Sequence, residues 1–371
     1  GKKIRAEMDK QRERFVEGCI EGGIPKGQAN TIFDLLAKFA DYGFNKSHAA
    51  AYALVAYQTA YLKANYPTEF LAASMTLDMN NTDKLNDFRN DAKRLGIEVV
   101  APSVQTSFRP FEVEKGRILY SLAAIKGAGE HAVDHIVAER ANGPFRSLED
   151  FCARIDPRIV NKRTLECLIT AGALDCFGHD RARLCGNIER LSAYAIMVND
   201  GRLSGQHDMF GGGGEPEPLT LKDVPLWTTA ERLMREFQSI GFYLSAHPLD
   251  EYKAALKRLN VQSYAELSAS VRKGATAGRV AGTVTSRQER KTRTGGKIGI
   301  VQLSDPTGQF EIVLFTEMLV KFRDMLEAGS SVIVSVSAEE RPEGVSLRAQ
   351  GVESLEVQAA RMQKAMKIFM R

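Results

Sequence analysis

A change to two-residue periodicity near residue 278 constrains the fold of this chain more than any other feature of its sequence. Apolar and polar residues alternate through three segments, a helical stretch covers residues 316–327, and two further alternating segments follow at 332–336 and 345–352. The apolar positions of the first three segments are Val280, Gly282 and Val284, then Ile298, Ile300, Val301 and Leu303, then Phe310, Ile312, Leu314 and Phe315. Three strands, a helix and two strands are the element order of an OB-fold, so we predict a five-stranded β-barrel.

Basic residues gather between the first two predicted strands, opposed only by Glu289. They are Arg287, Arg290, Lys291, Arg293 and Lys297. The loop at this place borders the nucleic-acid groove of an OB-fold, so we predict that these residues bind single-stranded DNA. A solvated run of charge is the alternative. Because few aromatic residues are present to stack on bases, the predicted binding is weak and mostly electrostatic.

The composition is that of an ordinary globular protein. The chain has 371 residues, 44% hydrophobic and 26% charged, which is long enough for two or three domains. No apolar run is long enough to cross a membrane, so we expect no membrane partner. The five cysteines include no Cys-x-x-Cys pair, which indicates reduced thiols and a cytoplasmic protein. A net charge of +4 confines any nucleic-acid contact to local basic patches.

A lysine and two glycines precede a helical stretch at residues 130–140. The glycine spacing superficially matches a dinucleotide-binding fingerprint, but residues 142–146 form a turn where that fold needs a parallel strand. A helix-hairpin-helix is the better interpretation, because the glycines allow a sharp bend and the next helix offers free N–H groups to phosphate. A looser second copy covers residues 161–174, with a plain helix connection as the alternative. The predicted phosphate contacts to duplex DNA are Lys126, Gly127, Gly129 and Gly172.

A glycine tract and a Glu-Pro repeat at residues 211–218 can hold neither a helix nor a buried strand, so we predict an exposed loop. Met209 and Phe210 stand side by side just before this tract. Adjacent apolar side chains in a solvated loop have no core of their own, which predicts that they enter a groove of another protein. Gln206 would fix the register by hydrogen bonds, and Phe210 would be the rigid anchor. Folding back onto the domain is the alternative.

A polar run precedes an alanine-rich helical stretch near residue 49. Ser47 is predicted as the N-cap of that helix and Pro67 as its stop, which places Lys46 and His48 beside a helix N-terminus. Such an end attracts phosphate through free N–H groups and the helix dipole. Simple capping of the helix is the alternative.

Two sets of side chains are of types that occur in catalytic sites, but their surroundings in the sequence favour structural roles. Asp83, Asp87 and Asp91 share one helical face, but basic residues lie between them, so we predict a salt-bridged surface and not a metal site. His247 precedes Pro248 with no nucleophile motif nearby, which indicates a structural turn. We therefore predict no catalytic residue, no metal site and no cofactor within this sequence.

These stretches together resemble the C-family of replicative DNA polymerases, the alpha subunits of bacterial DNA polymerase III, in the same order and almost from end to end. The resemblance is carried by residues 44–52, 57–60 and 67–70, the paired hairpins at 125–129 and 161–174, the segment 206–210 and the stretch 242–249. It implies that Gln206, Asp208, Met209 and Phe210 bind the sliding clamp, the beta subunit. His207 departs from the small residue expected at that spacer position. The resemblance further implies that template or incoming nucleotide is contacted by Asn45, Lys46, Ser47 and His48.

The resemblance also implies a domain layout within a multidomain α+β fold. Mostly α-helical fingers cover residues 1–99, a helix-hairpin-helix clamp-binding domain covers 100–262 with its loop at 205–214, an OB-fold covers 263–353, and a tail begins at 354–371. We expect the catalytic aspartates and the Mg²⁺ of the intact DNA-directed DNA polymerase to lie in a palm upstream. Other regions of the intact subunit would bind the remaining subunits of the polymerase III holoenzyme. This part, inactive alone, would hold duplex and single-stranded DNA and tether to the clamp.

Two other functions stay open on sequence grounds. One is a self-contained metal-dependent nuclease that uses the aspartates at 83–91. The other is a stand-alone scaffold that binds single-stranded and duplex DNA without a clamp partner. Loss of clamp binding when Met209 and Phe210 are both replaced by alanine would distinguish the polymerase part from that scaffold.

Overall fold

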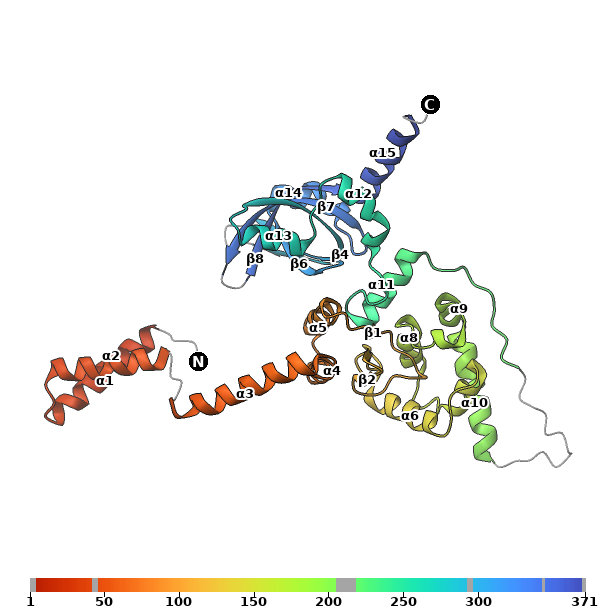
Figure 1. The fold of residues 1–371 in the computed structure, drawn as a ribbon, viewed down its shortest axis with the longest axis horizontal. Helices are drawn as coiled ribbons and strands as arrows, with labels where there is room; N and C mark the ends of the chain where they lie inside the picture. The colour runs from red at the N-terminus through yellow and green to blue at the C-terminus, as the bar shows by residue number, and fades with distance from the viewer. Residues whose placement is uncertain (1–4, 42–45, 205–217, 292–295, 342–343, 369–371) are drawn as a thin grey trace. The chain divides into compact units, whose positions relative to one another are not determined.

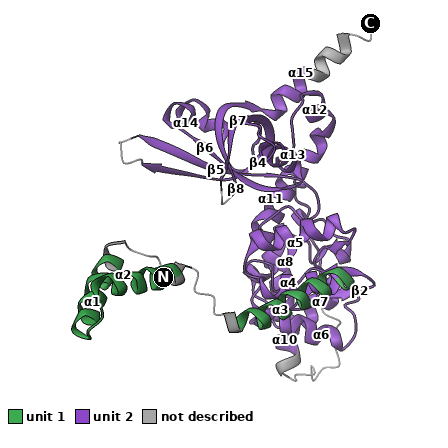
Figure 2. Ribbon diagram, turned by 60° about the vertical axis from the view of Figure 1, so that its left-hand side comes forward, with its two compact units in different colours: residues 1–66 green, residues 67–371 purple. Residues whose placement is uncertain are grey.

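The computed structural model describes residues 5–41, 46–204, 218–291, 296–341 and 344–368. The chain divides into two compact units, residues 1–66 and 67–371, and each is considered by itself (Figure 2). The first unit is helical where it is described, and the second contains a helical part followed by a closed barrel (Figure 1). This arrangement confirms the predicted α+β fold class with a five-stranded barrel after mostly helical segments.

Two helices of the first unit pack against each other. The helices of this unit are α1 (Arg5–Glu21), α2 (Lys26–Asp41) and α3 (Lys46–Asn65). Gly23, with φ of +82°, makes the turn between α1 and α2. The rings of Phe15 and Phe33 lie 5.5 Å apart between these helices, and Arg12 covers the Phe33 ring while it forms an ion pair with Asp34. The exposed apolar side chains of α3 include Tyr52, Leu54, Val55 and Tyr57.

The helical part of the second unit surrounds one hydrophobic cluster. Its helices are α4 (Pro67–Leu77), α5 (Thr82–Arg94), α6 (Glu130–Ala141), α7 (Leu148–Arg154), α8 (Lys162–Thr170), α9 (Arg181–Gly186), α10 (Ile188–Ser204) and α11 (Thr229–Ile240), with a 3-10 turn η1 (Asp175–Phe177). The predicted stop at Pro67 is confirmed, since α3 ends at residue 65 and Pro67 begins α4. The turn predicted at 142–146 is confirmed as well, because α7 and not a strand follows α6.

A small sheet lies in the same part of the second unit. Its strands are β1 (Val99–Val100), β2 (Glu112–Glu114) and β3 (Arg117–Leu119), in the order β1-β3-β2 with β1 parallel to β3. Met75 of α4 and Leu85 of α5 are buried in one cluster with Ile118 of β3. The hydrophobic cluster therefore continues across residue 99, and the predicted domain limits stay predictions.

The barrel closes in the strand order β4-β5-β6-β8-β7. Its strands are β4 (Ala277–Lys291), β5 (Lys297–Asp305), β6 (Gly308–Leu314), β7 (Ser331–Arg341) and β8 (Gly344–Ser354). The predicted alternation is confirmed on β5 and β6, where Val301, Leu303 and Ile312 are buried in the barrel core. On β4 residues 280–284 are all buried, and Phe315, predicted in the third strand, is exposed at the start of α14. The remaining elements are η2 (Pro248–Tyr252), α12 (Lys253–Arg258), α13 (Tyr264–Val271), α14 (Thr316–Phe322), η3 (Arg323–Met325) and α15 (Leu355–Ile368).

Candidate nucleic-acid interface

A tight turn at residues 125–129, the glycine turn, leads into α6. Gly127 has φ of +87°, a conformation that favours glycine, and the N–H of Ala128 donates to the carbonyl of Ile125 at 3.0 Å. A Cβ on Gly127 would lie 2.7 Å from Sγ of Cys167, so α8 packs too closely for a side chain there. The predicted sharp bend is confirmed at Gly127, where backbone conformation and packing both require glycine.

The N-terminus of α6 lacks a side-chain cap. Gly129 is its N-cap residue and provides no side-chain hydrogen bond, whereas the side chains of Asn81, Ser147 and Asn161 cap α5, α7 and α8. The first N–H groups of a helix have no partner within it and carry the positive end of the helix dipole. The start of α6 therefore presents donors that suit a phosphate oxygen.

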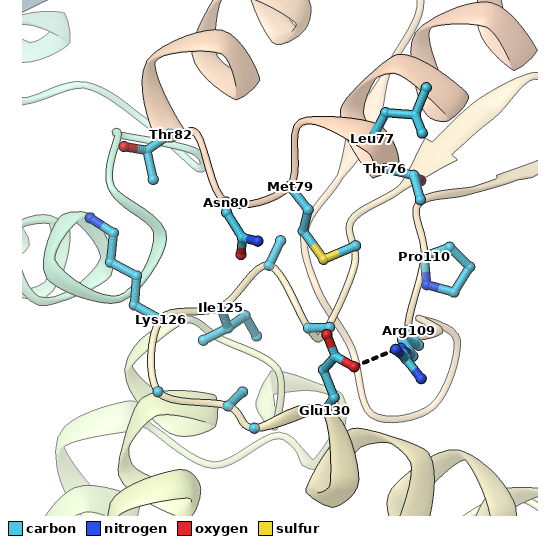
Figure 3. Close-up of a pocket in the computed structure, with 15 residues that line it drawn as sticks. Thr76, Leu77, Met79, Asn80, Thr82, Arg109, Pro110, Ile125, Lys126 and Glu130 are labelled. Atoms are coloured by element: carbon cyan, nitrogen blue, oxygen red, sulfur yellow. Dashed lines mark hydrogen bonds and ion pairs between the residues drawn. The ribbon is translucent and has the colours of Figure 1, made fainter.

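The glycine turn lines a pocket of ≈ 730 Å³, the turn pocket, which also contains two cationic side chains. Arg109 forms ion pairs with Glu130 and, at 3.3 Å, with Asp134. Figure 3 shows Arg109 and Glu130 on one side of the pocket and Lys126 on the other, toward Thr82. Within the described ranges Lys126 has no carboxylate partner. Lys126 is therefore the cation of this pocket that can pair with a phosphate.

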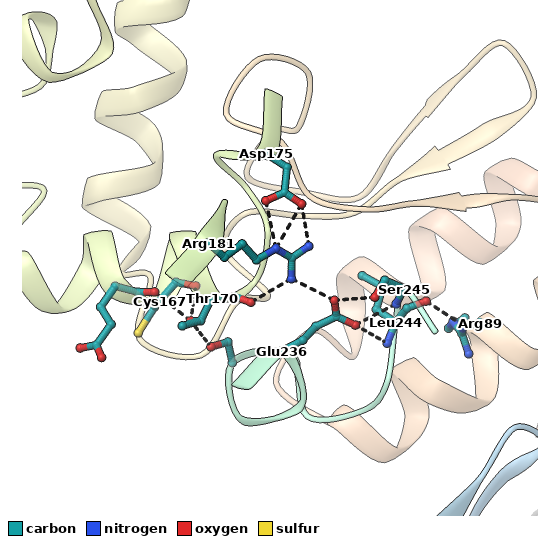
Figure 4. A network of polar contacts seen from close by, with 10 residues as sticks. Arg89, Cys167, Thr170, Asp175, Arg181, Glu236, Leu244 and Ser245 are labelled. Carbon is teal, nitrogen blue, oxygen red and sulfur yellow. Dashed lines mark hydrogen bonds and ion pairs between the residues drawn. The ribbon is translucent and has the colours of Figure 1, made fainter. Parts of the chain in front are cut away.

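The second predicted hairpin ends in a glycine that side chains enclose. Gly172 has φ of +88°, but the guanidinium of Arg181 occupies the space where a Cβ would stand. Arg181 is buried and forms ion pairs with Asp175 at 2.7 Å and with the buried Glu236 at 3.1 Å (Figure 4). The turn pocket brings together the other three predicted phosphate contacts, Lys126, Gly127 and Gly129, but Gly172 does not line it.

The same network ties α11 to the segment that follows it and to the glycine turn. Glu236 accepts hydrogen bonds from the backbone N–H groups of Leu244 and Ser245, at 3.0 and 2.8 Å (Figure 4). The hydroxyls of Thr170 and Ser239 are 2.6 Å apart, and the carbonyl of Ser239 accepts from the N–H of Lys126 at 2.8 Å. Buried charged groups with several partners hold their surroundings in one geometry. The network thus positions the glycine turn against α8 and α11.

A second pocket, the barrel groove, lies between α5 and the barrel. Its volume is ≈ 660 Å³, and it shares Thr82 and Lys126 with the turn pocket. Burial, together with the neighbouring Asp83, raises the pKa of Asp87 at this groove. The barrel contributes polar side chains from three strands, Ser286, Gln302, Gln309 and Glu311. The groove is polar and partly acidic, and Lys126 joins it to the glycine turn.

The basic residues predicted in a loop between the first barrel strands are mostly in the strands themselves. Arg287, Arg290 and Lys291 lie on β4, Lys297 begins β5, and Arg293 lies outside the described residues. The loop prediction was wrong because β4 and β5 stay paired up to those ends. Arg290 and Lys291 are exposed, whereas Arg287 donates to the carbonyls of Arg323 and Leu326 at 2.5 and 3.4 Å. Arg287 therefore braces the barrel, whereas Arg290, Lys291 and Lys297 are exposed to solvent.

Two other predicted sites lie partly or wholly outside the described residues. Asn45 is outside, and α3 begins at Lys46, so Ser47 lies within its first turn and the predicted N-cap at Ser47 was wrong. His48 is exposed on α3. The predicted clamp-binding residues outside the described ranges are Gln206, Asp208, Met209 and Phe210. Nucleotide and clamp contacts therefore stay predictions.

The chain after residue 217 is held against α9 and α10. The side-chain amide of Asn187 donates to the carbonyl of Lys222 at 2.9 Å and accepts from its N–H at 2.8 Å. Arg190 donates to the carbonyl of Thr220 at 2.9 Å. Residues 220–222 are thus fixed to the helical part of the second unit.

Side chains that suggested catalysis have structural partners. His247 is buried, its Nδ1 accepts from the N–H of Leu249 at 3.1 Å, and it caps η2, which confirms the predicted structural turn. Asp91 is paired with Arg94, as expected for a salt-bridged face. Among the residues described, no group of three or more His, Cys, Asp or Glu side chains is arranged to hold a metal ion. The described part also contains no helix that is long and apolar enough to span a membrane.

One face of α5 was not predicted from the sequence to line a site. Thr82, Asn86, Arg89 and Lys93 all line pockets of the second unit. Their spacing of four, three and four residues places them on one helical face, which was the only available signal. Nothing in the local pattern indicates which elements lie opposite that face.

Family models match two parts of the chain. A helix-hairpin-helix motif matches residues 96–184, which contain the glycine turn. An OB-fold nucleic acid binding domain matches residues 279–355, which contain most of the barrel. The chain thus belongs to the class of proteins that combine a helix-hairpin-helix motif with a nucleic-acid-binding OB-fold.

Curated relatives narrow this class to one family. DNA polymerase III subunit alpha of Caulobacter vibrioides is 47% identical over 360 residues, which are 96% of this chain and 31% of that protein. The same subunit of Pseudomonas aeruginosa is 42% identical, and that of Thermus aquaticus 40%, each over 96% of this chain and over 32% and 29% of the relative. By homology the chain belongs to the DNA polymerase III alpha-subunit family, and it spans about a third of the length of these relatives.

Two solved structures each match 22% of the chain. The second OB-fold domain of replication protein A from Methanococcus maripaludis is 21% identical, covering 22% of this chain and 84% of that domain, with a TM-score of 0.19. The mitochondrial single-stranded DNA binding protein Rim1 of S. cerevisiae is 19% identical, covering 22% of this chain and 96% of that protein, with a TM-score of 0.20. The barrel assignment depends on its strand order instead.

Proposed function

We propose that this chain is the part of a DNA polymerase III alpha subunit that holds DNA and tethers the polymerase to a sliding clamp. One observation carries the DNA-holding role: the uncapped start of α6 meets Lys126, which has no carboxylate partner among the described residues, in one pocket that continues into the barrel groove. The homology to DNA polymerase III alpha subunits supports a role in template-directed DNA synthesis.

The two parts of the second unit suit two forms of DNA. Backbone N–H groups and a lysine at the glycine turn bind phosphates without reading bases, as the duplex behind a primer end requires. The exposed Arg290 and Lys291 on β4 provide charge for a single strand. Phe310 offers no surface for stacking, because it is buried beside Tyr264 with ring centroids 4.7 Å apart, whereas Phe315 is exposed. Binding is then mostly electrostatic and decreases steeply with salt.

The clamp contact is proposed on sequence grounds, from the Gln-x-x-Met-Phe segment at 206–210. The fixation of Lys222 by Asn187 and of Thr220 by Arg190 supports it, since these bonds anchor the chain a short distance after the proposed contact. A tether raises the local concentration of polymerase at the primer end, so a contact of modest affinity can sustain long synthesis.

Nucleotidyl transfer with Mg²⁺ is proposed for the intact subunit only. The carboxylates of α5 do not fit a two-metal centre, because Asp91 is paired with Arg94 and no metal-binding group occurs among the described residues. Contacts to the remaining holoenzyme subunits are likewise assigned to regions of the subunit other than this chain.

Calorimetric titration of the chain with a bacterial sliding clamp tests the tether. Saturable binding is expected for the wild type and for a control in which Ile196 and Met197, adjacent exposed apolar residues on α10, become alanine. The Met209→Ala, Phe210→Ala variant is expected to bind at least about tenfold more weakly. Equal binding by both double variants would contradict the tether and favour the stand-alone DNA-binding scaffold.

A further inference from the structure

One face of α5 follows a row of adjoining pockets in the second unit. Thr82 lines the turn pocket and the barrel groove, and Asn86 lines the barrel groove and a third pocket of ≈ 280 Å³, the α5 pocket. Arg89 and Lys93 line the α5 pocket and a further one beyond it. Because an α-helix rises about 1.5 Å per residue, Thr82 and Lys93 lie roughly 16 Å apart along the axis of α5. The row of pockets therefore runs from the glycine turn to two cations.

Arg89 is partly buried without a carboxylate to pair with among the described residues. Its Nη2 donates to the carbonyl of Leu244 at 2.9 Å, a neutral acceptor. Burial lowers the pKa of the Arg89 guanidinium, while the more distant Glu236 and Asp250 act in the opposite direction. Glu236 accepts from Arg181, and Asp250 pairs with Lys253 at 2.9 Å. The desolvated cation thus retains capacity for an anionic ligand.

Lys93 stands one turn further along the same face and is exposed. No carboxylate partner of Lys93 occurs in the described part of the chain, although its neighbour Arg94 is paired with Asp91. The remaining carboxylate of the α5 pocket, Asp305, is buried and accepts from the N–H groups of Tyr264, Thr307 and Gly308 at 2.6, 2.8 and 2.9 Å. The pocket therefore presents two cations whose neighbouring carboxylates are engaged elsewhere.

We propose that Arg89 and Lys93 bind a phosphodiester group of a nucleic-acid strand that also contacts the glycine turn. The inference rests on the proposed DNA-holding function and extends the phosphate path along α5. A span of roughly 16 Å equals about five phosphates of one strand at about 3.4 Å each along a duplex axis. The ammonium of Lys93 and the guanidinium of Arg89 can bind the same phosphate. The guanidinium can donate two parallel hydrogen bonds to it, and the ammonium adds a second positive charge.

The test is fluorescence anisotropy of a labelled primer–template that has a single-stranded overhang, titrated with the chain at several salt concentrations. Lys93→Ala is expected to weaken binding about three- to tenfold at low salt and to reduce the slope of log K against log salt by about 0.7–0.9. Arg94→Ala is the matched control, because it removes the same charge from the adjacent, already paired position. It should leave the slope unchanged.

A second variant tests the partly buried Arg89 with a substitution that is expected to preserve folding. Arg89→Gln keeps a donor for the carbonyl of Leu244 but removes the charge. It should match Lys93→Ala in slope while its thermal melting, followed by circular dichroism, stays cooperative. Lys126→Ala at the glycine turn reports on the proposed DNA-holding function separately.

The outcomes separate the inference from that function. If Lys126→Ala reduces the slope and Lys93→Ala does not, DNA holding stands and the α5 site is refuted. If neither variant reduces it, both proposals fail. A calorimetric titration with inorganic phosphate distinguishes the ligand source. Phosphate binding that Lys93→Ala abolishes without any change in DNA affinity would assign the pocket to a free anion and overturn the proposal.

Discussion

The imidazole of His247 contacts the hydroxyl of Ser304, with Nε2 and Oγ 3.2 Å apart. Ser304 is on strand β5 of the barrel, and His247 precedes η2, so the contact joins the segment after α11 to the barrel inside the second unit. The other ring nitrogen accepts from the N–H of Leu249 at 3.1 Å. An acceptor role at Nδ1 requires an unprotonated nitrogen there. The hydrogen bond from Leu249 to the ring thus depends on a neutral imidazole.

The stability of the second unit should therefore depend on pH through His247. Burial lowers the pKa of His247 from 6.5 to about 4, with Asp250 acting against this shift and Arg89 with it. Because the unfolded chain binds the proton more readily, the contribution is complete above about pH 6.5 and is lost as pH falls toward 4. We expect roughly 3 kcal/mol of the free energy of unfolding to depend on this group across that window. Urea denaturation at several pH values measures it.

The variant His247→Gln should flatten that pH dependence while it lowers stability at neutral pH. His131→Gln is the control, because His131 is exposed on α6 and its replacement should leave the slope as in the wild type. If His247→Gln preserved the full pH dependence, other groups would account for it and the neutral buried imidazole would be refuted.

The buried Glu236 should be required for stability. Its replacement by alanine removes one of the two carboxylates that pair with Arg181 and leaves the N–H groups of Leu244 and Ser245 without their acceptor. Loss of one partner from a buried ion pair costs about 3–5 kcal/mol of the free energy of unfolding. Glu231→Ala, on the same helix and 43% exposed in its pair with Arg235, should cost at most about 1 kcal/mol. Similar losses for both variants in urea titrations would contradict a structural role of the network.

The barrel and the glycine turn could be predicted from sequence because their signals are local. Alternation at every second residue encodes which side of a strand is buried, and Val301, Leu303 and Ile312 obey it. A turn that needs φ above zero selects glycine, as Gly127 shows. Both patterns can be read within a few residues of the chain.

The parts that escaped prediction depend on contacts far apart in sequence. Arg89 meets the carbonyl of Leu244 from 155 positions away, so its partner could not be known from the charges around it. Arg287 was assigned to a loop because basic residues are common there, but its partners lie 36 and 39 positions further on. Charge patterns identify cations, and only tertiary packing decides which of them brace the fold.

Gly127→Ala should destabilise the second unit by two separable effects. A positive φ of +87° disfavours alanine, and the added Cβ would lie 2.7 Å from Sγ of Cys167. Together we expect a loss of roughly 1–3 kcal/mol in the free energy of unfolding. In a Cys167→Ala background the overlap disappears, so the cost of Gly127→Ala should fall by about 1 kcal/mol without vanishing. A coupling energy near zero in this double-mutant cycle would show that backbone strain alone makes the position sensitive.

Single-stranded DNA binding should depend on the two exposed cations of β4. Replacing Arg290 and Lys291 by alanine removes charge from the barrel without touching its core, since both side chains are exposed. For a single strand each lost phosphate contact lowers the slope of log K against log salt by about 0.7, so the double variant should lose about 1.4. Anisotropy titrations of a labelled oligonucleotide over about 0.05–0.2 M salt measure this slope.

The control for that experiment is the Arg272→Ala, Lys273→Ala variant. Arg272 and Lys273 are an equally charged, exposed pair at the end of α13, so the net charge of the chain changes by the same amount. General electrostatic attraction would lower the affinity of both double variants alike, because it depends on net charge and not on position. A slope reduced only by loss of Arg290 and Lys291 would instead locate the strand on β4. Equal slopes for the two variants would refute that location and leave the bound strand to other surfaces of the second unit.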